Sequence, residues 1–185
     1  ISLGLGTETT DEDGDPNTDL TIDFGFFYDA YDLGDLPDGP YNTTTGSGGP
    51  THLIVGDVYL GDSVDAEDDG QPNSGATGDD ENGADDEDGV IFFTPLAPDR
   101  PAEVRIYATS DGYLSSFIDF DADGTLDQAN YSSLDATSVA STPLNNVFLT
   151  EGWHTFFIDV PSTATISETI YSRFRFTSEN GGATT

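Results

Sequence analysis

The sequence contains no cysteine, no methionine and no lysine, and four arginines stand against 36 acidic residues. Without cysteine, disulfides, thiolate nucleophiles and cysteine-based zinc or iron–sulfur sites are excluded. Without lysine, Schiff-base chemistry and the lysine of a phosphate-binding loop are excluded as well. A formal net charge of −32 argues against binding of nucleic acid or an anionic membrane surface through charge. No apolar run approaches the ~20 residues of a membrane span, so we expect no membrane insertion.

The hydrophobic fraction of 35%, together with the large net charge, is typical of disordered chains. Aromatic residues nevertheless make up 11% of the chain and fall inside short strand-like runs, where they could form a core. The length of 185 residues suits one domain of ordinary size with an extension. The absence of a signal peptide at Ile1 leads us to expect a mature or excised segment of a longer protein.

Acidic residues are unevenly spread along the chain. Residues 1–99 carry 25 acids and no arginine, whereas residues 100–185 carry 11 acids and all four arginines. Between Asp65 and Asp88, 11 of 24 positions are Asp or Glu. Such a block is either a solvated linker or a set of turns in which carboxylates converge on cations, and its many Asp-Gly and Asn-Gly pairs favour the turns. The predicted metal ligands of this block are Asp65, Glu67, Asp69, Asp79, Asp80, Asn82, Asp85, Asp86, Glu87 and Asp88.

The segment 119–127 fits the first nine positions of an EF-hand-type calcium loop, with Gly124 at the sharp turn. The bidentate acid expected at the twelfth position is absent, so another loop must complete the shell. Strand-like flanks predict a calcium loop without the usual pair of helices, against the alternative of an ordinary Asp-Gly turn. The predicted ligands are Asp119, Asp121, Asp123, Thr125 through its backbone carbonyl, and Asp127.

A second loop has oxygen-bearing side chains at every other position, against the alternative of a flexible acidic hairpin loop. These ligands are Asp11, Asp13, Asp15, Asn17 and Asp19. Oxygen ligands without sulfur favour a hard cation, and the number of carboxylates favours several Ca²⁺ ions over Mg²⁺. Since millimolar free calcium is an extracellular condition, the sequence predicts an extracellular or cell-surface protein whose folding is coupled to ion binding.

Between the acidic loops the hydrophobic periodicity is close to two, and no stretch has a helical apolar stripe. This pattern predicts an all-β protein, an antiparallel β-sandwich of jelly-roll or immunoglobulin-like type with long acidic calcium-binding loops. The predicted strands are 20–26, 103–108, 113–120, 153–160 and 169–177, with weaker candidates at 52–60, 90–94 and 146–150. In the last strand we expect Ser172, Phe174 and Phe176 to face inward, and Arg173 and Arg175 to face outward toward the acidic loops.

The sequence contains DLGDLPD at 32–38, His52, LG at 60–61, VDAEDDGQP at 64–72, GDD at 78–80, DDEDGV at 85–90, FIDFDADG at 117–124, VP at 160–161 and YSRFR at 171–175. Together these motifs resemble the GEVED domain, a module of large secreted and surface-anchored microbial proteins. They cover residues 32–180 in the family's order, and the family's closing Gly-Glu-Val-Glu-Asp signature is absent at 181–185. The resemblance implies a module of a secreted or surface-anchored microbial protein.

Residues 1–28 resemble instead the end of a serine-aspartate-repeat B-type domain, a calcium-binding, collagen-adhesin-B-like module of bacterial adhesins. Only its last two strands are present, and isolated strands leave apolar faces and edges unpaired. We therefore expect residues 1–30 to form a strand extension, 31–50 a linker and 51–185 the sandwich domain. Either 1–6 or 20–27 could act as a donor strand that inserts into a neighbouring copy; the alternative is that these strands fold back or belong to a longer polypeptide.

The leading functional prediction is a non-catalytic, calcium-stabilised structural module of a microbial surface protein, adhesin or filament, with copies of itself or neighbouring domains as partners. The rival is a carbohydrate-binding adhesin module with glycan partners, for which Trp153 is a candidate platform unless it is a core or rim aromatic. Neither histidine has a serine constellation around it, so we expect no enzyme. Asn42 and Asn130 fit the glycosylation pattern.

Overall fold

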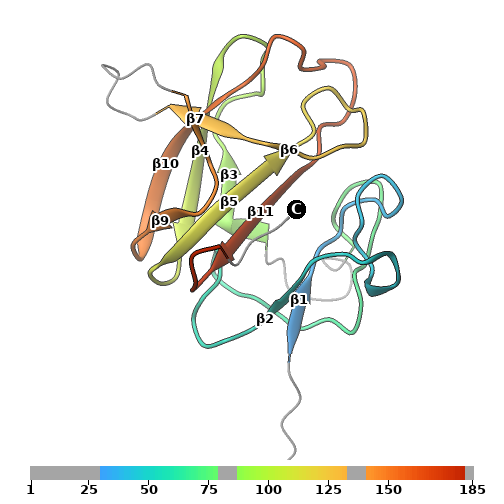
Figure 1. Cartoon of the computed structure of the whole chain (residues 1–185), viewed down its shortest axis with the longest axis vertical. Helices are drawn as coiled ribbons and strands as arrows, with labels where there is room; N and C mark the ends of the chain where they lie inside the picture. Colours follow the sequence, from blue (N-terminus) through green and yellow to red (C-terminus); the bar gives the residue numbers. More distant parts are fainter. Residues whose placement is uncertain (1–29, 79–86, 133–140, 182–185) are drawn as a thin grey trace, which may run out of the picture.

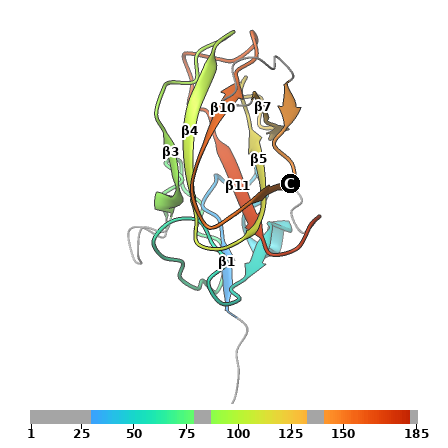
Figure 2. The same ribbon diagram turned by 90° about the vertical axis from the view of Figure 1, so that its left-hand side faces the viewer.

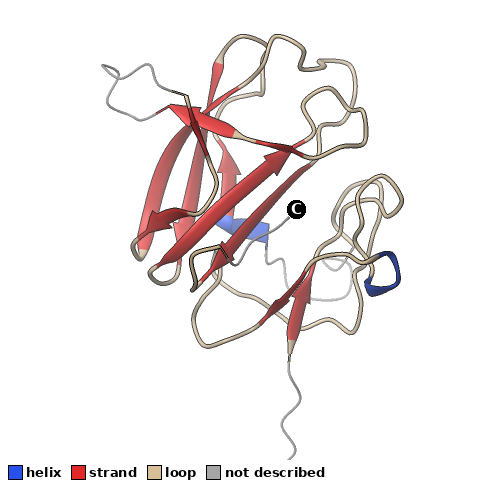
Figure 3. Cartoon of the chain, in the orientation of Figure 1, coloured by secondary structure: helices blue, strands red, loops and turns tan. Residues whose placement is uncertain are grey.

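The computed structural model describes residues 30–78, 87–132 and 141–181, and within them the protein is all-β. Its regular structure consists of short antiparallel strands and two single turns of 3-10 helix, η1 (Thr45–Ser47) and η2 (Glu87–Gly89) (Figure 3). The strands are β1 (Tyr31–Leu33), β2 (Thr51–Leu53), β3 (Val90–Phe92), β4 (Pro101–Ala108), β5 (Gly112–Ile118), β6 (Asp127–Gln128), β7 (Asn130–Ser132), β8 (Thr142–Pro143), β9 (Val147–Leu149), β10 (Gly152–Asp159) and β11 (Ser172–Thr177).

Two sheets enclose a common core, and we call the part formed by β3 to β11 the two-sheet body (Figures 1 and 2). One sheet has the strand order β3-β4-β10-β7-β8. The other has the order β11-β5-β6, and β9 also pairs with β5. All of these pairings are antiparallel. The chain passes from one sheet to the other between β4 and β5 and again between β9 and β10, and the core lies between the two sheets.

The longest strand pair shows why the alternating sequence forms this sheet. In β4 every second side chain is fully buried, including Val104 and Ile106, while those between face outward. The register sets Phe156 of β10 opposite Val104 and Ile158 opposite Ala102, so both strands turn their apolar residues to one side. Burying an Ile or Phe side chain in this way contributes roughly 1.5–3 kcal/mol. Alternation with a period of two is thus sufficient to fix which face points to the core.

The central strand β5 is buried on both faces. Leu114 and Ile118 are fully buried in the core between the sheets. On the other face Ser115 lies beside Arg175 of β11 and Phe117 lies beside Arg173. Both Ser115 and Phe117 are buried as well, because a separate part of the chain covers this side.

That part is the N-terminal lobe, residues 30–78, which contains η1 and the β1–β2 pair (Figure 1). The segment 31–50, expected to be a linker, carries β1 and the buried side chains Leu36 and Tyr41. β1 pairs with β2, so strand pairing crosses the predicted boundary at residue 51. The lobe has little regular structure, and several of its amide groups donate to side chains instead of to backbone carbonyls. Asp38, for example, accepts hydrogen bonds from the Thr43 amide at 3.0 Å and from the Ser47 hydroxyl at 2.6 Å.

Specific polar contacts join the lobe to the sheet of β5 and β11. The Tyr41 hydroxyl donates to Asp119 Oδ2 at 2.5 Å, and the Tyr41 ring packs on Tyr171 with centroids 5.2 Å apart. The Tyr171 hydroxyl donates to the carbonyl of Ser74 at 2.9 Å. Arg173 donates to the carbonyl of Asn42 at 3.0 Å. The end of β5 is therefore held between the two parts of the molecule.

Candidate metal site

The loop between β5 and β6 brings three carboxylates together. One oxygen from each of Asp119, Asp121 and Asp123 lies within 4.8 Å of the other two. Gly124 has a φ of +87°, a conformation that glycine adopts without strain, and Ala122 also has a positive φ of +58°. The tight turn folds the alternating Asp side chains toward one point. Among the residues that the structure describes, this is the only such group of three metal-ligating side chains.

Asp119 is the buried anchor of this loop. Its side chain is fully buried, its Oδ1 accepts from the Asp123 amide at 3.1 Å, and its Oδ2 accepts from the Gly124 amide at 2.8 Å. Burial alone would raise the pKa of Asp119, but the hydrogen bonds from Tyr41, Gly124 and Asp123 outweigh it and hold the pKa below its usual range. The carboxylate is therefore ionised and positioned before any cation binds.

The rest of this loop supplies a hydrogen bond within the turn and a carboxylate that lies apart from the three-Asp group. Asp123 accepts a hydrogen bond from the Thr125 amide at 2.8 Å, which fixes the second half of the turn. Asp127 begins β6 and pairs with Ile118, and its carboxylate is outside the group of three. Since Ca²⁺ takes six to eight oxygen ligands, carbonyls and water would have to supply the rest.

Three of the predicted acidic ligands, Glu67, Asp69 and Asp88, accept hydrogen bonds from backbone amides. Glu67 Oε2 accepts from the Leu33 amide at 2.9 Å, and Asp69 accepts from the Thr45 amide at 2.6 Å. Asp88, in η2, accepts from the amide of Asp62 at 2.9 Å. These carboxylates tie together loops that lack their own hydrogen-bonded ladders. They act as structural acceptors, a role that sequence reasoning did not assign to them.

Glu67 has the most perturbed carboxyl group among these. Burial raises its pKa to about 8; the Leu33 amide opposes the shift, and contact with Asp65 and the charge of Asp32 add to it. A carboxyl with such a pKa holds a proton at neutral pH.

Several predicted ligands lie outside the described residues. Of Glu87 the structure describes the backbone alone, at the start of η2. The predicted ligands that lie wholly outside the described residues are Asp11, Asp13, Asp15, Asn17, Asp19, Asp79, Asp80, Asn82, Asp85 and Asp86.

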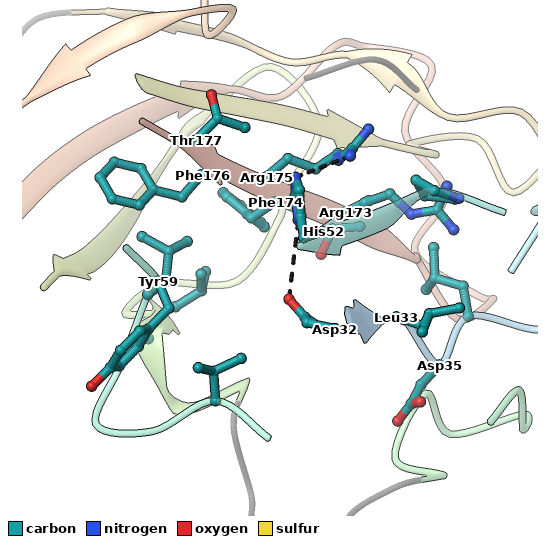
Figure 4. A pocket seen from close by; sticks show the side chains of 18 of the residues that line it. Asp32, Leu33, Asp35, His52, Tyr59, Arg173, Phe174, Arg175, Phe176 and Thr177 are labelled. Carbon is teal, nitrogen blue, oxygen red and sulfur yellow. Dashed lines mark hydrogen bonds and ion pairs between the residues drawn. The ribbon is translucent and has the colours of Figure 1, made fainter. Parts of the chain in front are cut away.

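A second polar cluster, which sequence reasoning missed, lies where the lobe meets β11 (Figure 4). His52 of β2 stands between Arg175 and Asp32: its Nε2 is 2.9 Å from the Arg175 guanidinium and its Nδ1 is 4.0 Å from Asp32. Burial, assisted by Arg175, lowers the pKa of His52 to about 4. The distant Asp32 carboxylate does not reverse this shift. Arg175, expected to face outward, is itself buried, since the lobe covers it.

His52 predicts a stability that depends on pH. In the unfolded chain a histidine takes up a proton near pH 6.5, whereas folded His52 remains neutral down to about pH 4. The unfolded state therefore binds more protons in this window, and the free energy of unfolding should fall as the pH falls from 6.5 to 4. His52→Gln keeps an acceptor for Arg175 and should reduce this dependence of the free energy of unfolding on pH. Urea unfolding at several pH values measures it. His154→Gln is the matched control, and an unchanged slope in His52→Gln would contradict the assignment.

Comparisons with known proteins give no relative: no family model, no curated protein and no solved structure matches the chain. The described residues also contain no helix that is long and apolar enough to cross a membrane.

Proposed function

We propose that this chain is a non-catalytic, calcium-stabilised structural module of a microbial extracellular surface protein or filament. Its body is a β-sandwich of jelly-roll or immunoglobulin-like type, and calcium ions bound in its acidic loops neutralise a strongly self-repelling chain. Its partners are copies of itself or neighbouring domains of a longer polypeptide. The resemblance of its motifs to the GEVED domain supports the same class of protein.

The observation that carries this proposal is the convergence of Asp119, Asp121 and Asp123 on one point. Asp119 is ionised and fixed by hydrogen bonds, whereas Asp121 and Asp123 are exposed and near enough to share a cation with it. Three carboxylates so close together repel one another in the absence of a cation. A divalent cation relieves this repulsion and joins the end of β5 to the turn that leads into β6.

Asp121 provides the sharpest test, because its carboxylate is exposed and has no hydrogen bond to another described residue. In a chelator, Asp121→Ala should melt at or slightly above the temperature of the wild type, since it removes one of three carboxylates that repel one another, and a surface substitution changes stability by roughly 0.5 kcal/mol or less. In millimolar Ca²⁺ it should lose most of the calcium-dependent rise in melting temperature that this loop supplies.

The matched control is Glu151→Ala, which removes an exposed carboxylate outside the loop and changes the net charge by the same amount. It should retain the full calcium response. If Asp121→Ala and Glu151→Ala melt alike in Ca²⁺, the loop is not a calcium site.

A second candidate function, carbohydrate binding by an adhesin module, is favoured by one observation. Trp153 of β10 is 59% exposed and packs beside Tyr107 of β4, with ring centroids 5.2 Å apart. Two neighbouring aromatic rings on the outside of a sheet can stack on a sugar ring. Glycan binding that depended on Trp153 would favour this function over a purely structural one.

A further inference from the structure

Side chains, and not paired strands, join the lobe to the sheet of β5 and β11. The contacts come from the Tyr41 and Tyr171 hydroxyls and from the guanidinium groups of Arg173 and Arg175. Among the described residues no strand of the lobe pairs with β5 or β11, because β1 and β2 form a sheet of their own. We call this contact the lobe joint. Its separation would break no backbone ladder, and local openings of this kind need less free energy than global unfolding.

The lobe and the two-sheet body bury their apolar side chains in separate places. Leu33 and Leu36 of the lobe are buried, but neither belongs to the core between the two sheets. Within the described part of the chain, Val58 and Leu60 are the only lobe residues that pack against this core. Leu60 also forms a β-bridge with Ala108 at the end of β4. The lobe is thus anchored to the body at this short segment, and the rest of it can separate while the core stays intact.

The imidazole ring of His52 belongs to the lobe joint, and its contacts require it to be neutral. A guanidinium group has donors only, so the 2.9 Å contact between Arg175 and His52 Nε2 needs an unprotonated nitrogen as its acceptor. The single ring proton is then on Nδ1, which lies 4.0 Å from Asp32 (Figure 4). A second proton, on Nε2, would face the Arg175 donor and abolish the bond. Protonation of His52 and closure of the lobe joint therefore oppose each other.

The surroundings of His52 favour the neutral ring as well. Burial is the larger cause of its low pKa of about 4, and the positive charge of Arg175 adds to it. Asp32 is the nearest carboxylate, but its charge also acts on Arg175 and supports that cation. The other titratable groups that line the hollow around His52 form no hydrogen bond or ion pair with it in the described structure; they are Asp35, Tyr59, Tyr171, Arg173 and Glu179.

Glu67 responds to pH in the opposite sense, but its interactions lie within the lobe. Burial raises its pKa, and the partners that modify this shift are Leu33, Asp65 and Asp32, all of them lobe residues. Separation of the lobe leaves these partners together, so Glu67 changes the opening equilibrium little. A comparison with a variant of His52 cancels what remains, since Glu67 is the same in both proteins.

We propose that protonation of His52 releases the lobe from the sheet of β5 and β11, so that the lobe joint is closed at neutral pH and opens in acid. Opening exposes Ser115 and Phe117 of β5, which are buried beneath the lobe. In the separated lobe His52 is solvated and takes up its proton near pH 6.5, whereas in the closed joint it does so only near pH 4. Opening therefore becomes easier as the pH falls through this window, and no easier below it. The inference goes beyond the proposed function, since it concerns a conformational device that needs no calcium.

The test measures the distance between the lobe and the body in the full chain, which has no cysteine of its own to interfere with labelling. Spin labels are attached at Gly46→Cys in the lobe, where an added Cβ meets no atom closer than 3.9 Å, and at exposed Thr150→Cys in the body. Double electron–electron resonance is recorded in a chelator, so that calcium occupancy cannot vary with pH. Between about pH 7.5 and about pH 5 the ratio of the open to the closed population should rise roughly 30-fold.

His52→Gln in the same labelled chain keeps an acceptor for Arg175 and should lose most of this rise, whereas His154→Gln should retain it. Proton NMR of the His52 ring in the unsubstituted chain gives a second readout that does not require a variant to fold. The ring should gain its proton over the range in which the lobe separates, while the amide signals of β4 and β10 stay unchanged. Labels that remain at the closed distance down to about pH 4, a His52 ring that is protonated with the joint closed, an equal response in His52→Gln, or separation only when β4 and β10 unfold would each overturn the proposal.

Discussion

In 1 mM Ca²⁺ the melting temperature of the protein is expected to lie about 5–10 °C above its value in a chelator. One site whose dissociation constant is a hundredfold below the calcium concentration stabilises the folded state by about 2.7 kcal/mol. For a domain of this length each kcal/mol corresponds to roughly 2–4 °C. Further sites in the acidic loops would add to the rise. Differential scanning calorimetry of metal-free and calcium-loaded protein measures it directly.

Two controls separate calcium binding from general screening of the −32 charge. Sodium chloride at matched ionic strength screens repulsion without occupying a site, and should give only a small part of the rise. Mg²⁺ at the same concentration should also give little, since it demands near-octahedral geometry and dehydrates reluctantly. Equal shifts with sodium, magnesium and calcium would show that the effect is electrostatic screening alone.

Asp119→Ala is expected to be the most damaging single substitution in the acidic loops, even in a chelator. It removes a fully buried carboxylate and leaves the Tyr41 hydroxyl and the amides of Asp123 and Gly124 without their acceptor. An unsatisfied buried donor such as the Tyr41 hydroxyl costs about 1–3 kcal/mol, and the two part-buried amides add a smaller loss, so the free energy of unfolding should fall by about 2–4 kcal/mol. Urea unfolding in a chelator measures this structural part without any contribution from calcium.

Tyr41→Phe is the partner variant for a double-mutant cycle. Burial and the adjoining Asp119 raise the pKa of Tyr41 above its usual range, so the hydroxyl remains a donor at every accessible pH. Tyr41→Phe alone should cost about 1–2 kcal/mol, and its effect should largely vanish in the Asp119→Ala background. Additive losses from the two substitutions would show that the hydrogen bond between them contributes nothing.

Local patterns were sufficient to predict the long strands and the three-Asp turn. Predicted strands at 103–108 and 153–160 are confirmed by β4 and β10, because apolar residues at every second position fix a core-facing side. The spacing of Asp119, Asp121 and Asp123 brings their oxygens together, since the turn that joins them is local in sequence. Whether an ion binds there remains a prediction.

What sequence reasoning missed depends on contacts between distant residues. The strands β1, β6, β7 and β8 have two or three residues each, too few for any periodicity to show. Tyr41 lies 78 positions from Asp119, and His52 lies 123 positions from Arg175. No local pattern predicts such pairs. The lobe forms because these contacts, and the carboxylates that accept its amide hydrogens, replace a regular ladder.

Asp119 takes part both in the contact between the lobe and the two-sheet body and in the hydrogen bonds of the acidic turn. One oxygen of its carboxylate is shared by the Tyr41 hydroxyl of the lobe and the Gly124 amide of the acidic turn. A cation that draws on the same carboxylate changes the strength of both bonds at once. Ion occupancy and attachment of the lobe would then be a single linked equilibrium, in which each changes the affinity for the other by the same factor. A rise in calcium concentration would thereby alter a contact that contains no predicted metal ligand except this one shared side chain.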